Sequence, residues 1–319
     1  MRGFRAAWFF GAVLSSAASC VAVDVPPPEP SPAPSVDAGA LAAELFSDDA
    51  LAREKAFDRL VAAGPEVRPA LEKAAGADPE RRETCAHVLK EIEWAALPLL
   101  GKPEDLAGIP DREAQAIGAL EAVASAPEEK PIAPFLIRTP SGSIPLSPGE
   151  LAMPAAAGRA IRVRGKIRAI ERAALGGRPE TVLVLEAASA ESLSIPEALS
   201  AARRIRGFRL QRDPQLRDER ERLLAALRRF DVSSFTPEGT ARHRALLRRI
   251  LEIDDGASVP TLAAIASNPK ALDAYTYDAV GALAGFGGLE ARACIREIAR
   301  TSAREGLRKR AERALVTGR

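Results

Sequence analysis

The segment Asp49–Leu60 (DALAREKAFDRL) is followed 29 residues later by a degenerate copy, Asp78–Leu89 (DPERRETCAHVL). The matching positions are Asp49 with Asp78, Arg53 with Arg82, Ala56 with Cys85 and Leu60 with Leu89. Self-similarity at a fixed period of roughly 20–50 residues is typical of proteins built from stacked repeats. Both copies carry apolar residues at helical spacing, so we expect each to form an amphipathic helix, the first over residues 50–63.

This pattern resembles the HEAT repeat, the two-helix unit of armadillo-like α-solenoids. The resemblance implies a mainly α fold in which neighbouring hairpins cover each other's apolar faces. In that family the equivalent Asp and Arg residues bond between neighbouring repeats. Carried over to this chain, that inter-repeat ladder would consist of Asp49, Arg53, Asp78 and Arg82. The alternative is that these residues make only local surface pairs four residues apart.

A second repeat-like region lies near the C-terminus. Leu262, Ile265 and Ala266 match Ile295, Ile298 and Ala299 at a spacing of 33 residues. This region also looks like HEAT units, although it lacks the Asp and Arg of the ladder.

The helical period is interrupted in the middle of the chain. We expect one more helix over 111–125 and then a small β module of three to four strands, in which Ile161–Arg168 alternates apolar with cationic residues. The expected fold is therefore mainly α, with HEAT-like α-solenoid hairpins on both sides of this module. The expected order is a signal peptide (1–22), a Pro-rich linker (23–37), an N-terminal HEAT-like helical region (38–130), the β module (131–190) and a C-terminal HEAT-like helical region (191–319).

The N-terminus has the pattern of an export signal. Arg2 and Arg5 precede an apolar stretch at 6–18, which is shorter than the roughly 20 residues that span a bilayer. Residues 17–20 (AASC) resemble a bacterial lipobox, which would make Cys20 the lipidated N-terminus; the alternative is ordinary cleavage nearby, for example after Ala22. The Pro-rich segment would be an extended spacer or a tail without a spacing role. We expect an exported cell-envelope protein that is anchored to the membrane by lipid.

Charge is distributed unevenly along the chain. Residues 24–130 contain 22 acidic and 11 basic side chains, whereas residues 131–319 contain 32 basic and 21 acidic ones. Within the basic half, residues 201–250 hold 14 arginines against six acids. Such a cationic surface can attract phosphates, anionic lipid headgroups or acidic proteins. The alternatives are solvated helix faces, or pairing with the acidic half of this same chain.

We therefore treat ten cationic residues as a candidate surface for an anionic partner. They are Arg162, Arg164, Lys166, Arg203, Arg204, Arg206, Arg209, Arg242, Arg244 and Arg248. Nucleic acid is not expected as the partner, because few aromatic residues accompany these arginines and an exported protein would not meet it.

Motifs that carry chemistry are missing from the sequence. Its two histidines, His87 and His243, stand outside any nucleophile motif, and neither a Gly-rich phosphate loop nor zinc-ligand spacing occurs. Cys85 and Cys294 are expected to be buried thiols, with a bridge between them as the alternative. We expect no cofactor, no metal and no catalysis.

The sequence thus supports two main hypotheses. The first is an exported scaffold that binds another protein. The second is a binding module for an anionic ligand, such as a lipid headgroup or a polymer, through the Arg-rich helices and a β module that is similar to a small OB- or SH3-like barrel. An enzyme of unknown type is the third alternative.

Overall fold

The computed structural model of the chain describes residues 37–123, 133–139, 141–151, 160–173 and 179–317. The expected signal peptide, Cys20 and nearly all of the Pro-rich linker lie outside these residues. The N-terminal helices are α1 (Ala38–Glu44), α2 (Ala50–Ala63), α3 (Arg68–Ala75) and α4 (Pro79–Ala95). A short helix, α5 (Glu104–Ala107), follows the first strand. The C-terminal helices are α6 (Ile195–Arg212), α7 (Pro214–Arg228), α8 (Pro237–Ile253), α9 (Val259–Ser267), α10 (Asp273–Phe286), α11 (Gly288–Thr301) and α12 (Glu305–Thr317).

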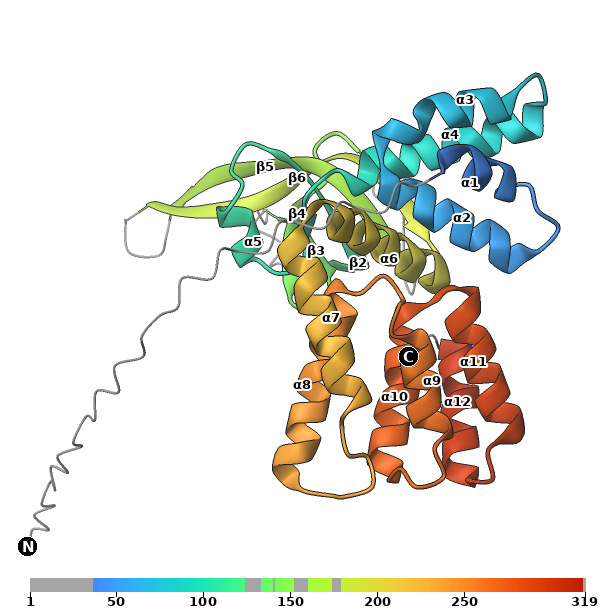
Figure 1. Cartoon of the computed structure of the whole chain (residues 1–319). Coiled ribbons are helices and arrows are strands. Elements are labelled where there is room, and N and C mark those ends of the chain that lie inside the picture. The colour runs from blue at the N-terminus through green and yellow to red at the C-terminus, as the bar shows by residue number, and fades with distance from the viewer. Residues whose placement is uncertain (1–36, 124–132, 140, 152–159, 174–178, 318–319) are drawn as a thin grey trace, which may run out of the picture. The chain divides into compact units, whose positions relative to one another are not determined.

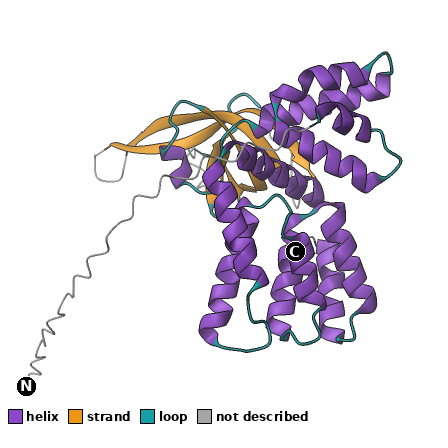
Figure 2. Ribbon diagram, in the orientation of Figure 1, coloured by secondary structure: helices purple, strands orange, loops and turns teal. Residues whose placement is uncertain are grey.

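In the sequence, the two groups of helices are separated by the strands of a six-stranded mixed sheet, which Figures 1 and 2 show. Its strands are β1 (Leu99–Leu100), β2 (Glu113–Ala122), β3 (Phe135–Arg138), β4 (Ser143–Ser147), β5 (Ala160–Ala173) and β6 (Pro179–Leu193). The prediction of a HEAT-like α-solenoid with a three- to four-strand module is therefore wrong. Helices dominate, as expected, but the sheet is larger than predicted and the helices do not form one continuous stack.

The helix predicted over 111–125 is also wrong, because this segment forms strand β2. Its sequence, EAQAIGALEA, contains good helix formers, yet β2 pairs antiparallel with both β3 and β5. Tertiary pairing overrides local propensity here. The strand expected over residues 161–168 is confirmed, and strand β5 extends beyond these bounds.

The double pairing of β2 closes the sheet into a ring. The order of pairing is β2-β3-β4-β6-β5 and back to β2, with β4 and β6 parallel, and β1 is added in parallel to β2. A five-stranded closed sheet of this order is the arrangement of an OB-type Greek-key barrel. Its interior is filled by aliphatic residues, among them Ile144, Leu146, Ile161, Val163 and Ile167.

Two glycines make this tight closure feasible. A Cβ atom on Gly165 would lie 2.0 Å from the carbonyl oxygen of Glu186, and one on Gly118 would lie 2.1 Å from that of Arg138. Gly165 follows the register shift between β5 and β6 at Arg164, and Gly118 stands where β2 passes from β5 to β3. Glycine at such bends lets the neighbouring backbone approach closely.

The described residues contain three separate apolar cores. One lies inside the barrel, and a second unites α7–α12 around residues such as Leu262, Leu283 and Phe286. The third unites α1–α4 and also takes in Ile205 and Phe208 of α6. Helix α6 therefore belongs to the N-terminal helical core, although the whole barrel separates it from α4 in sequence.

Gly165→Ala should lower the free energy of unfolding by about 1–3 kcal/mol, because backbone must move to admit the new methyl group. Gly108→Ala is the matched control, since Gly108 has a φ of −74° and a Cβ atom there would lie 3.6 Å from the carbonyl oxygen of Asp105, an ordinary contact distance. Urea denaturation of both variants measures the difference. Equal stability of the two would show that β5 and β6 do not approach as closely as described.

Candidate functional site

Two residues of the predicted cationic surface are buried inside the protein. Arg162 is only 1% exposed and Arg203 only 7% exposed. The Nη1 atom of Arg162 donates to Glu91 Oε1 at 2.7 Å, and the guanidinium lies 4.3 Å from the ring centroid of Trp94. These arginines therefore bind other parts of this chain rather than an external partner.

The buried arginines form a continuous chain of ion pairs with acids of the N-terminal helices. Arg162 of β5 bonds Glu91 of α4, which also accepts from Arg204 of α6 at 3.5 Å. Arg204 donates to Asp58 of α2 at 3.0 Å. Asp58 accepts from Arg203 of α6 at 2.6 Å, and Arg203 reaches Glu54 of α2 at 3.0 Å.

We call this set, Arg162, Glu91, Arg204, Asp58, Arg203 and Glu54, the arginine–carboxylate chain. It matches three positive with three negative charges, and it joins the sheet, the N-terminal helices and α6. It also touches the C-terminal helices, because Arg203 donates to the carbonyl of Gly287 at 3.2 Å and Glu54 accepts from the backbone amide of Leu289 at 2.7 Å. Burial by itself lowers the pKa of the Arg203 guanidinium, but Asp58 and Glu54 outweigh it and raise that pKa.

The remaining predicted cations fall into two groups. In the first group, Arg164 forms an ion pair with Glu113 at 2.6 Å, and Arg244 forms one with Asp278 at 2.9 Å. Arg206 donates to the carbonyl of Asp254 at 2.8 Å. The others are exposed side chains for which the described part of the chain offers no ion pair: Lys166, Arg209, Arg242 and Arg248. The cationic face of β5 is thus largely neutralised.

The predicted ladder residues act within their own loops. Asp49 caps α2 by accepting from the amide of Leu51, and Asp78 caps α4 in the same way. Arg53 donates to the carbonyl of Asp48 at 3.0 Å, and Arg82 donates to that of Ala77 at 3.1 Å. Each Asp–Arg pair therefore fastens the loop that precedes its own helix.

The cysteines and histidines form no recognisable site. Cys85 and Cys294 are both free thiols, and burial raises the pKa of each. Among the described residues there is no group of three or more His, Cys, Asp or Glu side chains that could hold a metal ion. In the same part of the chain, no helix combines the length and the apolar character needed to cross a bilayer.

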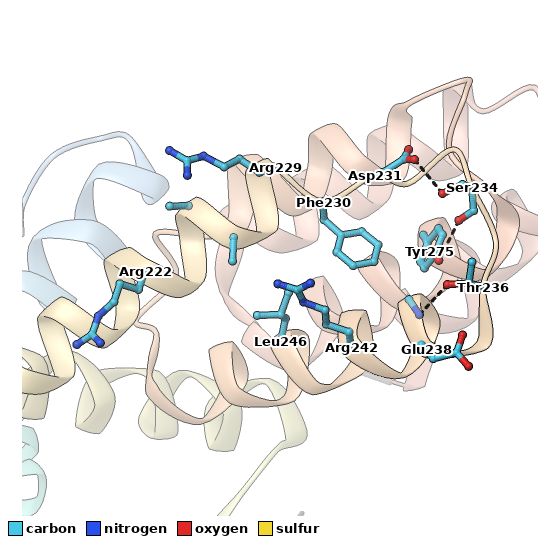
Figure 3. A pocket seen from close by; sticks show the side chains of 13 residues that line it. Arg222, Arg229, Phe230, Asp231, Ser234, Thr236, Glu238, Arg242, Leu246 and Tyr275 are labelled. Carbon is cyan, nitrogen blue, oxygen red and sulfur yellow. Dashed lines mark hydrogen bonds between the residues drawn. The ribbon is translucent and has the colours of Figure 1, made fainter. Parts of the chain in front are cut away.

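One cleft is lined by three arginines that form no ion pair with the described residues. It lies between α7 and α8, has a volume of about 720 Å³, and is lined by Arg222, Arg229 and Arg242 together with Phe230, Tyr275 and the loop that joins the helices (Figure 3). We call it the α7–α8 cleft. Arg242 belongs to the predicted surface, whereas Arg222 and Arg229 were not predicted. Their spacing of seven residues, which places both on one face of a helix, is the signal that could have identified them.

Local sequence positions the walls of the cleft. Asp213 caps α7 and Thr236 caps α8, and each is followed by proline at the first helical position. Arg249 of α8 clamps the two helices together by donating to both carboxylate oxygens of Glu219, at 2.7 and 2.8 Å. This bidentate pair fixes the spacing of α7 and α8 away from the connecting loop.

The loop at the other end is fixed by hydrogen bonds. Asp231 accepts hydrogen bonds from the hydroxyl of Ser233 at 2.6 Å, from the amide of Ser233 at 2.9 Å and from the hydroxyl of Ser234 at 2.8 Å. These three bonds hold the pKa of the Asp231 carboxyl below its ordinary value. The hydroxyl of Tyr275 donates to the carbonyl of Ser234 at 3.1 Å. The carbonyl of Val232 accepts from the amide of Leu272 at 2.9 Å. The cleft is therefore held in shape by bonds to α10 and to the α9–α10 loop.

Electrostatics divide the cleft into two ends. In Figure 3 the guanidinium groups of Arg222, Arg229 and Arg242 lie on one side of Phe230, and the carboxylates of Asp231 and Glu238 lie on the other. Within the described residues, Arg229 and Arg242 have no acidic partner, and Arg222 donates only to the backbone carbonyl of Asp218, at 3.2 Å. The arginine end can therefore attract an anion.

His243 lies directly behind the cleft. It is fully buried, its ring centroid is 5.0 Å from that of Phe230 and 4.9 Å from that of Tyr275, and neither ring nitrogen has a hydrogen-bond partner among the described residues. Burial lowers the pKa of His243, Asp278 opposes this shift, and Arg244 adds to it. The imidazole is thus held neutral against the back of Phe230.

The comparisons with known proteins assign no family. No family model matches the sequence, and neither a curated protein nor a solved structure matches the chain. The functional argument therefore depends on the geometry of this chain alone.

Arg162→Met should lower the free energy of unfolding by about 3–5 kcal/mol, because it leaves Glu91 buried with a weakened set of partners. Arg168→Met is the matched control: Arg168 is on the same strand face, and its 3.0 Å pair with Glu186 is half exposed, so about 1 kcal/mol or less is expected. Chemical denaturation measures both. A similar loss in the two variants would contradict a structural role for the buried chain of ion pairs.

Stability should fall as the pH is lowered through about 6.5, the ordinary pKa of histidine. The folded state keeps His243 neutral, so between its folded and unfolded pKa values the unfolded state binds more protons and gains free energy as the pH drops. His243→Phe should flatten this dependence between pH 7 and 5.5, as measured by urea denaturation at each pH. His87→Gln is the comparison variant: burial also lowers the pKa of His87, but its side chain is exposed, so we expect it to flatten the curve less. If only this variant flattens the curve, the assignment to His243 is wrong.

Proposed function

We propose that the protein is a binding protein whose α7–α8 cleft holds an anionic ligand. The observation that carries the proposal is the contrast between two sets of arginines. Those of α6 and β5 are neutralised by acids of the same chain, whereas Arg222, Arg229 and Arg242 line an open cleft without acidic partners among the described residues. A guanidinium group pairs well with phosphate and carboxylate, for which it offers two parallel donors.

The proposal moves the expected anion site from the β module to the helices. The cationic face of strand β5, on which the anion site was expected, is largely paired within the protein. Its residues Arg162, Arg164 and Arg168 each bond a carboxylate of this chain. The cleft, by contrast, is held in shape by bonds within the protein, namely the Arg249–Glu219 clamp and the hydrogen bonds of the loop. Preformed sites lose less free energy on binding, because little has to be ordered.

The location of the protein is a second part of the proposal. The N-terminal pattern of Arg2, Arg5 and the apolar stretch at 6–18 supports export, and Cys20 supports a lipid anchor. A protein of this kind would offer its cleft to anions of the cell envelope. The alternative role as a protein-interaction scaffold stays a prediction with less support, because it was argued from a solenoid that the structure does not show.

Arg242→Ala should weaken the binding of inorganic phosphate by about tenfold or more, because it removes a charged donor from the site. The binding is measured on the folded chain by following arginine Nε–H signals in an NMR titration. Arg248→Ala is the matched control, since Arg248 is exposed on the same helix, forms no ion pair with the described residues and does not line the cleft. Saturable binding that both substitutions weaken equally, or no saturable binding at all, would refute the proposal.

A further inference from the structure

The cleft has an apolar wall as well as its arginines. Ala225 and Ala226 face it from α7, Leu246 faces it from α8, and Phe230 closes one side (Figure 3). All four are half-buried and remain open to solvent. Apolar side chains contribute no affinity for inorganic phosphate, since a free oxyanion binds through polar donors.

The apolar wall is rigid and has room beside it. The ring of Phe230 is fixed from behind by Tyr275, at 5.4 Å between centroids with the planes 71° apart, and by His243. The two alanines are short, so they leave space between the helices instead of filling it. A volume of about 720 Å³ lies within the range of pockets that enclose small organic ligands.

The position of the arginines relative to this wall suggests how one molecule would fill both parts. Arg222 and Arg229 stand on either side of Ala225 and Ala226 along α7, and Arg242 stands one helical turn before Leu246 on α8. An anionic group held by the guanidinium groups would therefore place whatever is attached to it against the alanines, Leu246 and the Phe230 ring. Burying that attached hydrocarbon would add affinity in proportion to its area.

We infer that the ligand of the α7–α8 cleft is an amphiphilic anion, with an anionic head at the arginines and a hydrocarbon body at least the size of a benzene ring between α7 and α8. This inference depends on the proposed anion-binding function and specifies its ligand class. The body can be an aromatic ring or an alkyl chain, because both fit the shared chemistry of the wall.

The inference is tested by calorimetric titration of the folded chain with three probes: inorganic phosphate, phenyl phosphate and hexyl phosphate. Both organic phosphates should bind about tenfold or more tightly than inorganic phosphate, since each buries its hydrocarbon against the wall. The ratio of the two organic probes then separates an aromatic body from an alkyl one. If inorganic phosphate binds and the organic probes bind no better, the inference is wrong and the proposed function survives; if none of the three binds, both are wrong.

A substitution in the wall locates the effect. Ala226→Leu should fill the space and remove the advantage of phenyl phosphate over inorganic phosphate, with both affinities measured on this same variant. Ala245→Leu is the matched control, because Ala245 is exposed on α8 and does not line the cleft. An advantage of phenyl phosphate that persists in Ala226→Leu would place the hydrocarbon elsewhere and overturn the inference.

Discussion

The structure depends on a polar joint between apolar cores. The barrel and the two groups of helices each bury their own aliphatic residues, and the arginine–carboxylate chain runs between them from Arg162 through Glu91, Arg204 and Asp58 to Arg203. Ion pairs at such a junction are favourable only when geometry and hydrogen bonding compensate for lost hydration. Here the arginines also lie over aromatic rings, Arg162 over Trp94 and Arg204 over Phe57, which adds cation–π attraction.

This joint explains the uneven charge of the chain. The acidic first half contributes Glu54, Asp58 and Glu91, and the basic second half contributes Arg162, Arg203 and Arg204. Pairing with the acidic half was one of the alternatives open from the sequence. The sequence could not decide for it, because Arg204 and Asp58 are 146 residues apart and nothing local shows that they meet. For the same reason, the arginines left over for a ligand could be identified only after the internal pairs were known.

The helices were more predictable than the sheet. Helix α2 occupies the predicted residues 50–63, because the apolar spacing and the cap of a helix involve residues that are close in sequence. Strand β2 was mistaken for a helix because its pairing partners lie elsewhere in the chain and its alanines and glutamates favour helix locally. In the site, Arg242 was among the predicted cations, but its place opposite Arg222 and Arg229 depends on how α7 and α8 pack. No sequence pattern predicted that the ring of His243 packs behind that of Phe230.

The division of the cores also bears on how such a chain can change through evolution. Ile205 and Phe208 of α6 complete the core of α1–α4, so these helices form one unit in space. In the sequence, the barrel interrupts this unit, because its strands begin after α4 and end before α6. A module inserted in this way can be exchanged or enlarged while most of the buried apolar contacts of its host stay intact, although Leu99 and Ile117 of the sheet also pack on that core. A replacement would need a basic side chain where Arg162 now stands, so that Glu91 is not left without its counter-charge from the inserted module.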